Sequence, residues 1–123
     1  MLDVDGENCL IVLKNGAVTG LTLGRTGGIM SFVRYDDPDC GLAPVTSMEL
    51  AIHPYSKQDA PFSEGGDSGS VIVDSQGRIV GILTGGTGPK DSTDITYATP
   101  YYWLEQRVKA AFPDLHLYPI VPP

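Results

Sequence analysis

The chain has 123 residues, a formal net charge of −7 and hydrophobic residues at 41% of its positions. This composition is typical of one globular domain, spanning residues 1–123, rather than of a disordered chain. The acidic balance disfavours nucleic acid and anionic membranes as partners, because both repel negative charge. No run of about 18 apolar residues occurs, so no membrane-spanning helix is predicted.

The N-terminal residues and the cysteines bear on localisation. Met1–Asn8 is acidic and polar, without a basic segment followed by an apolar run, so no signal peptide is expected in this chain. Cys9 and Cys40 are too few for a disulfide framework. We expect two free thiols, with a single bridge as the alternative, and this usage is compatible with an intracellular protein. No metal site and no cofactor are expected, because no further Cys or His lies at ligand spacing.

Short runs of β-forming residues alternate with turn signals along most of the chain. Asn15-Gly16 favours a tight turn after the first run. Val18–Val33 contains four glycines and predicts either one long bulged strand or two short ones. Gly85–Asp94 is expected to be a loop. The predicted strands are Cys9–Leu13, Val18–Val33, Ser47–His53, Ser70–Val73, Arg78–Thr84 and Ile95–Ala98.

One helix is predicted, over residues 100–112. Thr99 can cap it, and Pro100 fits the first turn, where its missing N–H costs nothing. Glu105 and Lys109 have the spacing of an ion pair across one turn. Pro113 ends the helix, and an extended tail, 113–123, follows. One apolar face is formed by Tyr101, Leu104, Val108, Ala111 and Phe112.

About six antiparallel strands with glycine-rich corners, followed by one helix, predict an all-β fold in which the strands close into a small barrel. The motif that carries chemistry, Gly65-Gly66-Asp67-Ser68-Gly69-Ser70, lies between a polar loop and the fourth strand. Ser68 supplies a hydroxyl that can attack a carbonyl carbon. The N–H groups of Gly66 and Ser68 can converge on the oxyanion that forms, and Asp67 can hold the loop. The alternative is a glycine-rich turn without chemistry.

Two segments resemble the chymotrypsin-like (trypsin-fold) serine peptidases. Phe62–Phe112, with Gly-Asp-Ser-Gly-Ser followed by Gly81-Ile82-Leu83-Thr84-Gly85-Gly86 and a helix, resembles the C-terminal part of that fold. Lys14–Gly24 resembles the hairpin that starts the second barrel. The resemblance covers about Asn8 to Leu117 and looks closest to uncharacterised fungal proteins with a trypsin-like C-terminal domain. It implies a six-stranded Greek-key barrel with one C-terminal helix.

The resemblance also implies roles for single residues. Ser68 would be the nucleophile, with the Gly66 and Ser68 N–H groups as oxyanion donors. Thr84, Gly85 and Gly86 would form the strand edge that pairs with the substrate backbone. Phe62, six residues before Ser68, would form the floor of the specificity pocket, without a charged anchor for Lys or Arg substrates. The cysteines that brace the nucleophile loop in the family are absent here.

The other half of the catalytic machinery is missing. In this family the His and Asp of the triad precede the Ser and come from a first barrel, whereas only 67 residues precede Ser68. His53 is the one histidine before Ser68 and is interpreted first as a strand-end residue and second as a substitute base. His116 follows the helix, and Asp91 and Asp94 are interpreted as solvated loop residues.

Three hypotheses follow. In the first, the chain is part of a larger serine endopeptidase, inactive alone, that acts on a peptide or protein segment and is completed by a missing N-terminal barrel. In the second, it is a non-catalytic binding or structural module on a retired peptidase scaffold that pairs with a second copy of itself. In the third, His53 of one chain serves Ser68 of another across a dimer.

Overall fold

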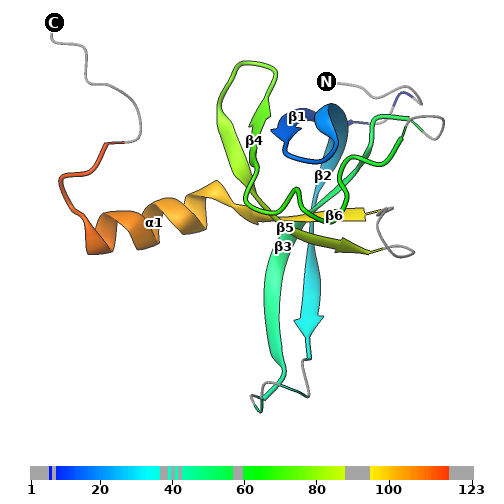
Figure 1. Cartoon of the computed structure of the whole chain (residues 1–123). Coiled ribbons are helices and arrows are strands. Elements are labelled where there is room, and N and C mark those ends of the chain that lie inside the picture. The colour runs from blue at the N-terminus through cyan, green and yellow to red at the C-terminus, as the bar shows by residue number, and fades with distance from the viewer. Residues whose placement is uncertain are drawn as a thin grey trace, which may run out of the picture.

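The computed structural model describes residues 6, 8–36, 39, 41, 43–56, 60–87 and 95–116. Within them, six strands form a closed antiparallel barrel and one helix follows (Figure 1). The elements are β1 (Leu10–Gly16), β2 (Gly20–Tyr35), β3 (Val45–Pro54), β4 (Val71–Asp74), β5 (Ile79–Thr87), β6 (Ile95–Pro100) and α1 (Tyr101–Ala111). The predicted all-β barrel with one C-terminal helix is confirmed.

The order of the strands around the barrel is β1-β2-β3-β6-β5-β4. Consecutive strands therefore pair except at β3 and β4, where the chain crosses to the far side of the barrel in the manner of a Greek key. That crossing contains residues 55–70, and hence the Ser68 motif. The topology thus places the motif at one end of the barrel, between two strands that do not touch.

The core follows from the alternation of side chains along each strand. Its fully buried apolar residues come from five of the six strands and from the crossing segment. Gly24 of β2 faces this core, and a Cβ there would lie 2.7 Å from the Phe62 ring and 2.8 Å from Ile52. The core residues are Val12, Ile52, Phe62, Ile72, Leu83 and Ala98.

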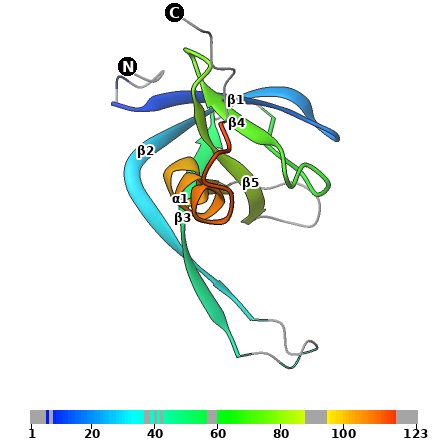
Figure 2. The ribbon, with the colours of Figure 1, turned by 90° about the vertical axis from the view of Figure 1, so that its left-hand side faces the viewer.

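β2 is one strand of 16 residues with a register shift between Thr26 and Met30, which resolves the two alternatives left open by its sequence. Beyond the shift, β2 pairs with β3 from Met30↔Leu50 to Tyr35↔Val45. These two segments, 30–35 and 45–50, form a two-stranded arm that projects from the barrel (Figures 1 and 2). The register shift lies just before the arm, and irregularities of this kind bend a strand.

The prediction of a turn at Asn15-Gly16 is wrong, because both residues belong to β1. The turn lies at 17–19 and ends at Gly20, whose φ is +66°. Gly16 serves a different purpose: a Cβ on it would fall on the carboxylate of Asp67. The glycine is explained by a close approach across the fold rather than by a local turn.

Several element ends also differ from the predictions. Gly85 belongs to β5, which continues to Thr87, so the loop predicted from Gly85 starts later. Thr99, the predicted cap, belongs to β6 and does not cap the helix. Pro100, predicted in the first turn, is itself the N-cap residue and has an extended backbone. The tail is not extended at its start, because residues 113–114 form a turn; 117–123 lie outside the described residues.

Helix α1 buries none of its residues completely. Its predicted ion pair is confirmed, with Lys109 Nζ 2.6 Å from Glu105 Oε1. The predicted apolar face is turned toward the barrel through Tyr101, Leu104 and Val108. No helix among the described residues is both long and apolar enough to cross a membrane.

We expect Gly24→Ala to destabilise the barrel by about 1–3 kcal/mol, because the added methyl would overlap Phe62 and Ile52 in a close-packed core. Gly27→Ala is the matched control on the same strand, since nothing lies within 4 Å of a Cβ there. Urea unfolding measures both. Equal stabilities for the two variants would contradict the packing described at Gly24.

Candidate functional site

The Ser68 turn is attached to β5 by backbone hydrogen bonds. The N–H of Gly69 donates to the carbonyl of Leu83 (2.8 Å), and the N–H of Leu83 donates to the carbonyl of Ser70 (3.0 Å). Within the turn, the N–H and the hydroxyl of Ser70 both donate to the carbonyl of Asp67. The turn is therefore closed on itself and held against the sheet.

Two glycines in the turn have left-handed backbone conformations, with φ of +99° at Gly66 and +89° at Gly69. Other L-residues rarely adopt these angles. At Gly66 the space is restricted as well, because a Cβ would lie 2.6 Å from Cγ2 of Val18. The two glycines of Gly66-Asp67-Ser68-Gly69 are thus explained by the shape of this turn.

The carboxylate of Asp67 is buried and accepts four hydrogen bonds. Oδ1 receives the N–H groups of Val18 (2.8 Å) and Thr19 (3.2 Å). Oδ2 receives the hydroxyl of Thr19 (2.6 Å) and the N–H of Glu64 (3.0 Å). The side chain next to Ser68 therefore joins the β1–β2 turn to the loop before β4.

A buried cation completes this network. The side chains of Lys14 and Asp67 are both fully inaccessible, with Lys14 Nζ 3.9 Å from Asp67 Oδ2. Lys14 donates to the hydroxyl of Thr19 (2.6 Å) and the carbonyl of Gly20 (2.9 Å), and its Nζ lies 5.3 Å from the centre of the Phe62 ring. Sequence analysis missed Lys14 as a site residue. The available signal was strand alternation, because Lys14 shares the inward face with Val12.

The environment shifts the pKa values of both charged groups. Burial by itself raises the pKa of Asp67, but hydrogen bonds from the Thr19 hydroxyl and three backbone N–H groups outweigh it and hold the pKa well below its usual range. Burial lowers the pKa of Lys14, and the negative charge of Asp67 offsets part of this shift. Asp67 therefore stays ionised and acts as a fixed acceptor rather than as a proton donor.

Ser68 lies at the exposed tip of the turn. Among the described residues, no acceptor is found for the N–H groups of Gly66 and Ser68, and no partner is found for the Ser68 hydroxyl. Two backbone donors and a hydroxyl are thus available at one exposed place. Backbone N–H groups without an acceptor are the kind of donor that can stabilise an oxyanion.

An open strand edge begins next to the turn. β5 pairs with β4 only as far as Ile82, and Leu83 pairs with the Ser68 turn. From Gly85 to Thr87, β5 pairs with β6 on one side only among the described residues. The predicted substrate edge, Thr84–Gly86, therefore lies one residue beyond the segment that holds the turn.

Among the described residues, Phe62, His53 and His116 make no hydrogen bond to Ser68. Phe62 lies in the barrel core with no exposed surface, and its carbonyl accepts the Thr22 hydroxyl (2.7 Å). His53 pairs with Arg25 between β2 and β3, and His116 follows the exposed end of α1.

Cys9 is a free thiol, whereas Cys40, Asp91 and Asp94 lie outside the described residues. Among the residues that are described, no group of three or more His, Cys, Asp or Glu could hold a metal ion.

An apolar face covers the outside of the barrel on β2, β1, β4 and β5. Leu13 points outward because its neighbours Val12 and Lys14 are buried, and it pairs with Leu23 and with Val73. Val71 pairs with Ile82 on the same face. We call these five residues and Leu21 (Leu13, Leu21, Leu23, Val71, Val73 and Ile82) the outer apolar face. Exposure is 71% at Leu21, 49% at Leu23 and 46% at Val71.

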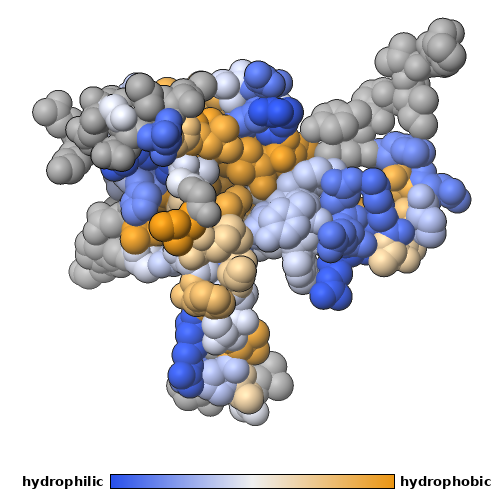
Figure 3. Space-filling model, turned by 180° about the vertical axis from the view of Figure 1, so that it is seen from behind, coloured by the Kyte–Doolittle hydropathy of each residue, from blue (hydrophilic) through white to orange (hydrophobic). Residues whose placement is uncertain are grey.

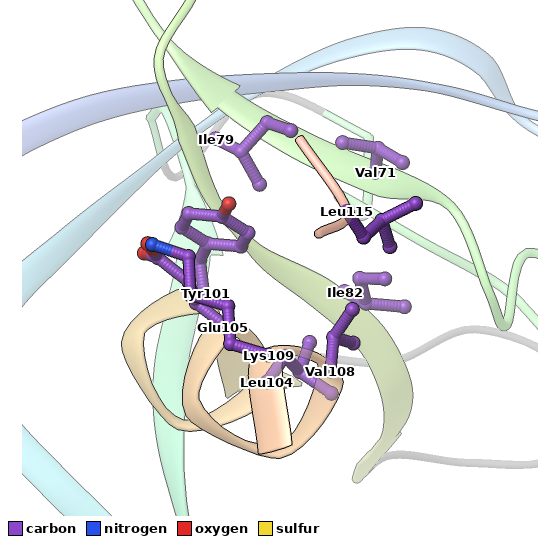
Figure 4. A pocket seen from close by; sticks show the side chains of 9 residues that line it. All are labelled: Val71, Ile79, Ile82, Tyr101, Leu104, Glu105, Val108, Lys109 and Leu115. Carbon is purple, nitrogen blue, oxygen red and sulfur yellow. The ribbon is translucent and has the colours of Figure 1, made fainter. Parts of the chain in front are cut away.

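This face continues into a hollow of about 220 Å³ between the sheet and α1 (Figure 4). Val71 and Ile82 line it from the sheet, Leu104 and Val108 from the helix, and Leu115 from the segment after it. Hydrophobic side chains are also visible on the barrel and near the root of the arm when the molecule is seen from behind (Figure 3).

Comparison of the chain with protein-family models, with curated proteins and with solved structures finds no match in any of the three.

We expect Lys14→Met to lower the free energy of unfolding by about 3–5 kcal/mol, because it keeps the apolar stem but leaves the buried carboxylate of Asp67 without its cation. Lys109→Met removes an exposed ion pair and should cost less than about 1 kcal/mol. Denaturant unfolding compares the two. Similar small losses for both would show that Lys14 is not part of the turn's support.

Proposed function

We propose that this chain is the nucleophile-bearing domain of a larger serine endopeptidase, completed by another domain of its parent chain or by a separate subunit. The observation that carries the proposal is the Ser68 turn. It combines an exposed hydroxyl, two N–H groups without an acceptor among the described residues, and a neighbouring open strand edge. The buried Lys14–Asp67 pair holds this arrangement in place.

In the proposed reaction, the peptide substrate pairs with the edge at Thr84–Gly86, which directs a peptide carbonyl to the turn. Ser68 attacks the carbonyl carbon, and the N–H groups of Gly66 and Ser68 stabilise the oxyanion. The proton of Ser68 must pass to a base that a partner supplies. Without that base, an oxyanion site and binding alone give roughly 10³–10⁴-fold over water, far below a working peptidase.

The outer apolar face supports the presence of a partner. Soluble monomers rarely expose contiguous apolar surfaces larger than a few hundred Å². Here Leu21 and Leu23 are exposed on the hairpin whose turn binds Asp67, and Val71 follows the Ser68 turn directly. A domain that covers this face would therefore lie beside Ser68, where it could deliver a base.

A fluorophosphonate probe tests the proposal, because it reacts with an activated serine hydroxyl. The isolated chain should label slowly or not at all, and the intact parent protein should label at Ser68. Ser68→Ala should abolish labelling, whereas Ser75→Ala, in the exposed turn after β4, should not. An intact parent that does not react would overturn the proposal.

The outer apolar face also favours a second candidate, a non-catalytic module that forms a homodimer through this face. In that case Leu23→Glu should convert the dimer to a monomer in sedimentation experiments, and Ser68→Ala should leave both the dimer and the cellular role unchanged. Loss of the cellular role in Ser68→Ala would contradict this candidate.

A further inference from the structure

A buried carboxylate at the root of the arm is not used by the proposed reaction. Glu49 is 8% exposed, and its Oε2 makes no hydrogen bond with the described residues. Among the described residues, its other oxygen, Oε1, accepts one long hydrogen bond, from the Thr99 hydroxyl (3.5 Å). A charge removed from water without a partner is costly, so such a group is expected to have a ligand.

Glu49 lines two hollows, one shared with Thr99 and the other with the open strand edge. The hollow shared with the strand edge has a volume of about 590 Å³ and is lined by residues of the arm and by Thr84, Gly85 and Gly86 of β5. Phe32 and Tyr97 supply aromatic surface to it. A peptide strand added to β5 would therefore run past Glu49.

The geometry points to Glu49 as the anchor for a lysine or arginine side chain of an extended peptide bound along β5. The aliphatic stem of that side chain would lie against Phe32 and Tyr97, and its cationic head would donate to Oε2 of Glu49. This inference deepens the proposed function and rests on it for the position of the peptide along Thr84–Gly86.

One cation of the chain already lines the same hollow, which makes it the alternative partner of Glu49. Arg34 is exposed on the arm, where it pairs with Thr46 of β3, and no ion pair joins it to Glu49. If Arg34 were the structural partner, removal of the Glu49 charge would destabilise the chain. If Glu49 awaits a ligand, Glu49→Gln relieves an unpaired buried charge and should stabilise the chain.

The experiment measures binding of a capped seven-residue peptide of alanine and threonine with one central lysine. Its twin carries norleucine, which has a similar stem without the ammonium. Isothermal titration with the unmodified chain should show about ten- to one-hundredfold tighter binding of the lysine peptide, the range of one hydrogen bond to a charged group. Glu49→Gln should remove this preference and raise the melting temperature.

Glu105→Gln is the matched control, because it removes one acidic charge outside the hollow and should keep the lysine preference. Equal affinity for both peptides in the unmodified chain would overturn the role of Glu49 and leave peptide binding at β5 intact. A lower melting temperature in Glu49→Gln would also overturn it, in favour of Arg34. If neither peptide binds, the inference fails, while labelling of Ser68 still judges the proposed function separately.

Discussion

The hydrogen-bonded carboxylate of Asp67 is the interaction on which the rest of the site depends. It binds the turn between β1 and β2, the loop before β4 and, through Lys14, the interior of the barrel. A buried carboxylate must have its acceptor positions satisfied, and each donor fixes one segment relative to another. The absence of a side chain at Gly16 and Gly66 follows from this. A Cβ on Gly16 would overlap the carboxylate, and a Cβ on Gly66 would meet Val18 in the turn between β1 and β2.

The fixed turn, in turn, organises the surface around it. Ser68 follows Asp67 directly, so its orientation depends on the buried network rather than on its own exposed contacts. The hydrogen bonds to Leu83 align the turn with β5, and beyond them, from Gly85 to Thr87, β5 pairs on one side only among the described residues. The position of the strand edge is therefore linked to that of the Ser68 hydroxyl and the backbone donors. The hollow along this edge is also lined by the carboxylate residue Glu49.

Much of the fold was predictable because it follows from local patterns. The six strands, the helix and the Glu105–Lys109 pair were predicted from alternation and spacing. Two of the errors fall where a distant contact overrides a local preference. Asn15-Gly16 has the sequence of a turn but continues β1, where Gly16 packs against the carboxylate of Asp67. Thr99 has the sequence of a helix cap but belongs to β6, where its hydroxyl donates to Glu49.

The sequence by itself determined the strand pattern and the Gly-Asp-Ser-Gly turn, because both are properties of neighbouring residues. Only the tertiary structure decided which side chains meet. It buried Phe62 in the core, brought Lys14 to Asp67 and placed Glu49 and Thr84–Gly86 around one hollow. Lys14 and Asp67 are 53 positions apart in the sequence, and Glu49 and Thr84 are 35 positions apart. Closure of the barrel determines which of these distant residues become neighbours, and no local sequence period encodes that.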